Sequence, residues 1–142
     1  MLKTSDQVVT NSATLTDDTA LVFALAASST YEFEGYIVWT EAGNGSADGK
    51  FSFTVPTGAT IRWVSTNQID ASTTVTGLVA VTASGGTVST DGGSSTNVLR
   101  IRGVLRTSTT TGNLQFQFAN LAAGNGRNTT INATSFLKIG KF

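Results

Sequence analysis

Two glutamates are the residues whose types and spacing come closest to a catalytic pair. Glu32 and Glu34 lie in the alternating segment 31–40, so they share one strand face at a separation of roughly 6.5–7 Å by strand rise. That separation is compatible with the two carboxylates of a glycoside hydrolase. A second alternating segment, 97–107, carries three arginines on one face, Arg100, Arg102 and Arg106. Cross-strand glutamate–arginine pairing on an outer sheet face uses both sets without any reaction, so we favour an interface over an active site.

The composition excludes most other catalytic chemistry. The 142 residues include no Cys and no His, which removes Cys/His zinc sites, haem and iron–sulfur ligation, thiol nucleophiles and Ser-His-Asp triads. No glycine-rich loop has the lysine and hydroxyl partners of a phosphate site, and the Asp-Gly pairs lack the spacing of a calcium-binding loop. We therefore predict that the protein is not an enzyme and uses no cofactor or metal.

The charge balance argues against nucleic-acid and membrane partners. Nine Lys+Arg balance nine Asp+Glu, and charged residues make up only 13% of the chain, so there is no strongly basic footprint. The longest apolar run, 21–27, is far shorter than the ~20 residues of a membrane helix, and residues 1–7 do not form a signal peptide. We therefore expect synthesis in the cytoplasm.

Period-two alternation dominates the chain, and no apolar stripe of helical period persists for three turns. Strands are expected at 7–10, 21–25, 31–40, 50–55, 60–64, 74–82, 97–107, 113–119 and 134–141. Turn clusters rich in Gly, Ser and Asn separate them. This pattern predicts an all-β, jelly-roll-like antiparallel β-sandwich of about eight to nine strands.

Alternation also predicts the core and the domain organisation. Phe33, Ile37 and Trp39 share one face of segment 31–40, and Phe51 and Phe53 share one face of segment 50–55. The Asn-Gly and Asp-Gly pairs between the two segments predict a hairpin. The length suits a single domain, with residues 1–11 as an extended N-terminal arm and residues 12–142 as the sandwich.

Both ends of the sequence resemble a family of tailed-bacteriophage virion proteins. Residues 3–18 read KTSDQVVTNSATLTDD, which is similar to the family pattern K-x-S-D-Q-x-V-x-N-S-x-T-L-x-x-D. The family strands L-x-F-x-L-x-A and Y-x-F have counterparts at 21–27 and 31–33. The closing strand S-[YF]-L has a counterpart at 135–137.

The resemblance implies a non-enzymatic β-sandwich that is usually trimeric. In this family the sandwich is either a free-standing capsid decoration (cement) protein or a terminal domain of tail fibres and minor tail proteins. Because the chain begins at the motif, without a preceding collagen-like or coiled-coil segment, we expect a decoration protein. Its partners are then the major capsid protein and itself as a homotrimer, and its location is the outer capsid surface of the virion. The alternative is a tail domain that recognises host-surface glycans, with Trp63 or Tyr36 stacking on sugar rings.

Two sets of contact residues follow from these expectations. Residues of the largely polar arm and of the segment after it are expected to contact the capsid or a neighbouring subunit: Leu2, Lys3, Thr4, Ser5, Asp6, Gln7, Asp17 and Asp18. The charged strand faces are expected to form the trimer interface: Glu32, Glu34, Arg100, Arg102 and Arg106. On this view, removal of residues 1–11 abolishes capsid binding and leaves a folded protein.

Overall fold

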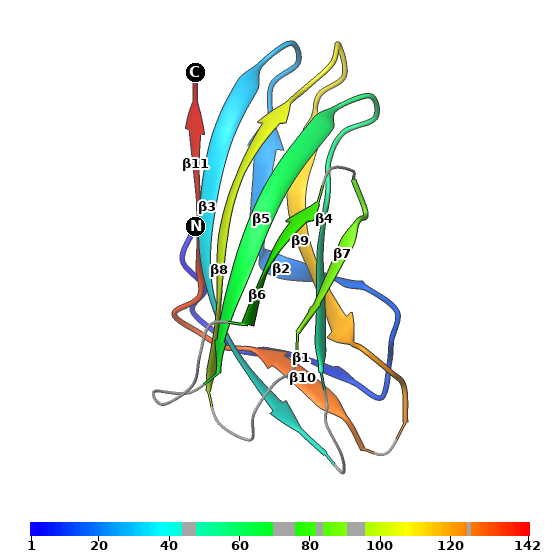
Figure 1. Ribbon diagram of the computed structural model, residues 1–142. Coiled ribbons are helices and arrows are strands. Elements are labelled where there is room, and N and C mark those ends of the chain that lie inside the picture. Colours follow the sequence, from blue (N-terminus) through cyan, green and yellow to red (C-terminus); the bar gives the residue numbers. More distant parts are fainter. Residues whose placement is uncertain (44–47, 70–75, 82–83, 91–95, 125) are drawn as a thin grey trace.

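Two antiparallel sheets pack face to face as a β-sandwich (Figure 1). The computed structural model describes residues 1–43, 48–69, 76–81, 84–90, 96–124 and 126–142, and none of these residues is helical. The predicted all-β antiparallel sandwich is therefore confirmed, with eleven strands within the described residues in place of the eight to nine expected.

The larger sheet has seven strands. Six follow the order β1 (Gln7–Thr10), β10 (Asn128–Ile131), β3 (Thr30–Ala42), β8 (Asn97–Arg106), β5 (Thr60–Ile69) and β6 (Thr76–Val81). The seventh, β11 (Phe136–Lys141), pairs with the first half of β3, while β10 pairs with its last residues. The smaller sheet has the order β2 (Thr16–Leu25), β9 (Gly112–Asn120), β4 (Gly49–Thr54) and β7 (Thr87–Thr90).

Aromatic side chains fill the space between the sheets. The inward faces predicted from alternation are confirmed, because Phe33, Trp39, Phe51 and Phe53 are all buried. Phe53 from the smaller sheet has its ring centroid 5.2 Å from that of Phe33 in the larger sheet, in an edge-to-face arrangement. It makes similar contacts at 5.3 Å with Trp63 and Phe116. Such pairs add to the free energy already gained by burying apolar surface.

The predicted hairpin between segments 31–40 and 50–55 is wrong. Strand β3 belongs to the larger sheet and β4 to the smaller one, so the chain crosses between the layers there. The inward faces of these strands meet across the core instead, with the rings of Trp39 and Phe51 5.2 Å apart. Strands β7 and β10 were not anticipated, because four-residue strands of mainly Thr, Ser and Asn carry little alternation signal.

The first eleven residues lie along the larger sheet rather than extending from it. Strand β1 pairs in register with β10, and Leu2 forms an isolated bridge with Phe136. The Met1 amino group donates a hydrogen bond to the Leu137 carbonyl at 2.7 Å. Figure 1 shows both chain ends on the β11 side of the sheet. The segment predicted to be an arm therefore forms part of the folded domain.

Replacing Gly103 by alanine is expected to lower the free energy of unfolding by about 1–3 kcal/mol. A Cβ at this position in β8 would lie 2.3 Å from Phe33 Cζ and 2.8 Å from the Arg62 carbonyl oxygen, so core and backbone must shift. Urea denaturation measures the effect. Gly140→Ala is the control, because its Cβ would first meet the Glu32 carboxylate at 3.4 Å. Equal midpoints for both variants would contradict the prediction.

Candidate functional site

The outer face of the larger sheet brings the predicted glutamates and arginines together. By the outer face we mean the side chains of β3, β5, β8 and β11 that point away from the core. Strand register arranges two central rows on it: Lys138, Glu34, Arg102 and Val64, followed by Gly140, Glu32, Val104 and Arg62. Arg100 and Arg106 flank these rows on β8. Both charged sets therefore share one face.

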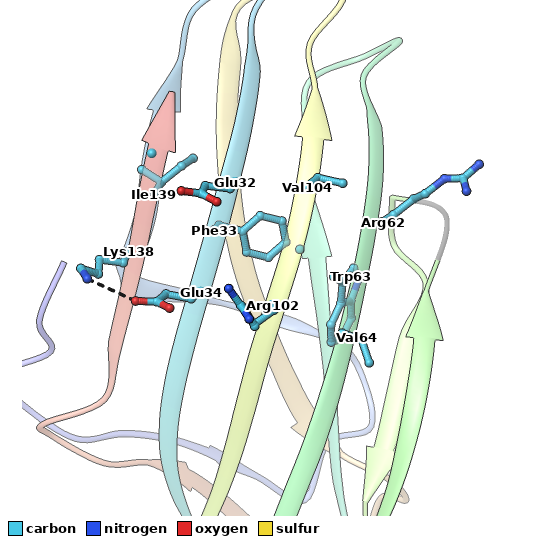
Figure 2. A pocket seen from close by; sticks show the side chains of 12 residues that line it. Glu32, Phe33, Glu34, Arg62, Trp63, Val64, Arg102, Val104, Lys138 and Ile139 are labelled. Atoms are coloured by element: carbon cyan, nitrogen blue, oxygen red, sulfur yellow. Dashed lines mark hydrogen bonds and ion pairs between the residues drawn. The ribbon is translucent and has the colours of Figure 1, made fainter. Parts of the chain in front are cut away.

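These two rows surround an open hollow of about 750 Å³. Val64, Val104 and Gly140 leave space between the longer side chains. Figure 2 shows Glu32, Glu34, Lys138 and Arg102 around this space, while Arg62 extends away on the far side of β5. The volume lies within the range of ordinary ligand pockets, but the hollow sits on an exposed sheet and not in an enclosed cleft.

Within the hollow, ion pairing is incomplete. Lys138 Nζ lies 3.2 Å from Glu34 Oε1, and these side chains are 73% and 47% exposed. Over residues 1–43, 48–69, 76–81, 84–90, 96–124 and 126–142, neither Glu32 nor Arg102 has an ion-pair partner. Glu32 and Glu34 are both exposed, whereas a glycosidase acid depends on an apolar or charge-crowded environment. The arrangement therefore suits binding through hydrogen bonds and charge.

An aromatic row borders the hollow on one side. Tyr36 stacks on Phe136 with ring centroids 6.0 Å apart and planes inclined by 9°. The Arg100 guanidinium lies over the Tyr36 ring, 5.8 Å from its centroid, which restrains the arginine on the face. Trp63 is only 3% exposed and packs against Phe53, so its ring does not offer the surface that sugar stacking requires.

Lys3 and Asp18, predicted to contact a partner, are instead buried against each other. Lys3 Nζ lies 2.8 Å from Asp18 Oδ2, and the two side chains are 1% and 0% exposed. The other carboxylate oxygen, Asp18 Oδ1, accepts hydrogen bonds from the backbone N–H groups of Ala20 and Leu21 at 2.9 and 3.0 Å. The pair links residues 1–6 to strand β2, and the two charges neutralise each other inside the domain.

Other polar residues near the N-terminus also make contacts within the chain. The Gln7 side chain donates to the Asp17 carbonyl at 2.8 Å and accepts from Thr19 N at 2.9 Å. Asp17 Oδ1 accepts from Gln117 Nε2 at 2.7 Å. Asp6 Oδ1 accepts from Ala133 N at 2.6 Å. The remaining members of the predicted contact set, Leu2, Thr4 and Ser5, are exposed.

Sequence reasoning missed several residues of the hollow. Lys138, Arg62, Val64 and Val104 were not proposed as site residues, although alternation within their strands could have assigned each of them to an outward face. The pairing of β11 with β3 brings Lys138 beside Glu34, and sequence periodicity does not reveal which distant strands pair. The site therefore depended on topology more than on residue type.

Comparison with known proteins identifies no relative. No protein-family model matches the chain, and neither curated proteins nor solved structures give a significant match. Where the structure describes the chain, no group of three or more His, Cys, Asp or Glu side chains is placed to hold a metal ion. The same part of the chain has no helix of the length and apolar character needed to cross a membrane.

Proposed function

We propose that this chain is a non-enzymatic structural protein of a bacteriophage virion. In this proposal it is a capsid decoration protein that binds the outer surface of the mature head as a trimer and stabilises it. The observation that carries the proposal is the outer face, where exposed arginines and carboxylates surround a hollow with two valines on a hydrogen-bonded sheet. Arginine is enriched in protein–protein interfaces, and a rigid surface limits the entropy lost on binding.

The resemblance at the two ends supports the assignment to a virion. Lys3, Asp6, Gln7 and Asp18 all belong to the resembling motif, and each makes hydrogen bonds that hold the N-terminal segment against the sandwich. Ser135, in the resembling closing strand, accepts a hydrogen bond from Val38 N at 3.0 Å and donates one to the Asn132 carbonyl oxygen at 2.8 Å. The residues that resemble the family are therefore residues whose contacts hold the N-terminal segment and the last strand in place. Related virion proteins would share such contacts because they share the fold.

Stabilisation by such a protein would follow from mass action. A protein that binds only the mature lattice lowers the free energy of that lattice at every equivalent site it occupies. A trimer can contact several neighbouring capsomers at once. Its overall affinity then rises, because the second and third contacts form at a high effective concentration.

Saturable co-sedimentation with empty, expanded capsids that lack the protein is the expected result for a decoration protein. Purified protein is added over a range of concentrations, and its copy number is read against the major capsid protein. The mass of the free protein in solution tests the trimer. Absence of capsid binding, combined with adsorption to host cells, would contradict the proposal and favour a tail domain.

A further inference from the structure

The outer face has an excess of positive charge although the chain is neutral overall. It carries five exposed basic side chains, Arg62, Arg100, Arg102, Arg106 and Lys138. Only two exposed acidic side chains, Glu32 and Glu34, lie among them, whereas the whole chain has nine of each sign. Two copies packed outer face to outer face would set like charges against each other. The face is therefore complementary to an acidic partner rather than to itself.

The floor of the hollow indicates a polypeptide rather than a sugar. Val104 and Val64 both line the hollow, and Val104 is 49% exposed. Val64 on β5 lies opposite Arg102 on β8. The two aromatic residues that line the hollow, Phe33 and Trp63, are each only 3% exposed, so neither presents a ring face for a pyranose. At the border, the Tyr36 ring is stacked on Phe136 and has the Arg100 guanidinium over it, so these neighbours already occupy its faces. An exposed aliphatic floor surrounded by arginines is instead typical of protein interfaces.

The Glu32 carboxylate further limits the class of ligand that the hollow can bind. This carboxylate has no ion-pair partner in the part of the chain that the structure describes, and it accepts hydrogen bonds only. A uniformly charged polyanion would bring negative charge close to the Glu32 carboxylate, and the two would repel each other. A polypeptide supplies both kinds of group, carboxylates for Arg102 and backbone N–H donors for Glu32.

We propose that the hollow binds an acidic polypeptide segment of the partner protein. Carboxylates of that segment pair with Arg102 and Arg100, the latter restrained by Tyr36, and an apolar side chain covers Val104. This inference rests on the proposed function only in taking the partner to be a protein. It assigns the outer face to contact with the partner, in place of the trimer interface expected from the sequence.

The first arm of the test uses a short peptide. The probe is an acetylated, amidated peptide of two Glu-Val-Glu-Gly repeats, added to isotopically labelled full-length protein. We expect amide chemical shifts to change on β3, β5, β8 and β11. A Gln-Val-Gln-Gly peptide should cause little change, because neutral amides lack the charge that pairs with arginine. Larger shifts with oligogalacturonate than with the acidic peptide would overturn the inference in favour of an acidic glycan.

The second arm uses charge reversal on the face and off it. Arg102→Glu is expected to weaken peptide and capsid binding by about tenfold or more, since it replaces attraction by repulsion. Lys141→Glu is the matched control, because this exposed lysine lies opposite the buried Tyr31 and so on the other side of β11. Lys141→Glu should weaken binding only through the change of two units in net charge. Added salt should suppress this small loss of affinity.

The outcomes separate the inference from the proposed function. Capsid binding that survives Arg102→Glu, with no shifts from the acidic peptide, would overturn the inference and leave the decoration function standing. Peptide binding that depends on Arg102, without capsid binding by the unaltered protein, would support the acidic-partner inference and remove the decoration function. Loss of both interactions in Arg102→Glu, but not in Lys141→Glu, would support both.

Discussion

Removal of residues 1–11 is expected to prevent the domain from folding stably. The deletion removes strand β1, exposes the edge of β10 and takes away Val9, which is 6% exposed. It also leaves Asp18 buried without Lys3. An uncompensated buried charge costs about 3–5 kcal/mol and a lost core valine about 1.5–3 kcal/mol, which together approach the whole stability of an ordinary domain, about 5–15 kcal/mol.

Circular dichroism and urea denaturation of the truncated protein measure this effect. Removal of Phe142 alone is the control at the other end of the chain, because this residue is 76% exposed and contributes one backbone hydrogen bond to Thr30. A truncated protein that unfolds cooperatively near the wild-type midpoint would contradict the prediction. Such a result would restore the sequence-based view that residues 1–11 are a dispensable arm.

Asp18→Ala is expected to lower the free energy of unfolding by about 3–5 kcal/mol. The substitution leaves the Lys3 ammonium buried without its counter-charge, and it removes the acceptor for the N–H groups of Ala20 and Leu21. Urea denaturation again gives the change. Glu34→Ala provides the comparison, since it breaks a lysine–carboxylate pair that is largely exposed and should cost at most about 1 kcal/mol.

A double substitution shows whether the buried pair itself is responsible. Lys3→Met with Asp18→Asn removes both charges and keeps a side-chain oxygen for the two N–H donors. Because neutral groups of similar size tolerate burial well, we expect the double variant to recover much of the stability that Asp18→Ala loses. A double variant no more stable than Asp18→Ala would show that packing around Lys3, and not charge pairing, determines the loss.

The inward faces of the strands were predictable because burial follows a local rule. Alternation along segment 31–40 placed Phe33 and Trp39 inside, and both are buried. The same rule placed Glu34 and Arg102 outside, where they are now cross-strand neighbours. Each of these statements needs only the period of a strand and the polarity of its residues.

Pairing partners were not predictable in the same way. The turn residues after β3 favour a hairpin locally, but β3 and β4 lie in different sheets and the rings of Trp39 and Phe51 meet across the core. Tertiary packing therefore overrode the turn signal. The polarity of residues 3–7 led to the prediction of an arm, because a polar segment is expected to contact solvent. In the structure Lys3 and Gln7 instead form hydrogen bonds with Asp18 and the Asp17 carbonyl.

The junction of the two chain ends has a consequence for the order of events during synthesis. The Met1 amino group bonds to Leu137, 136 residues later, and β3 acquires β11 as a neighbour only when residues 136–141 exist. Sheets built from such distant segments fold slowly and pass through stages with unpaired edges. We therefore expect a nascent chain that lacks residues 136–141 to be protease-sensitive, and native protection to arise only once these residues are present.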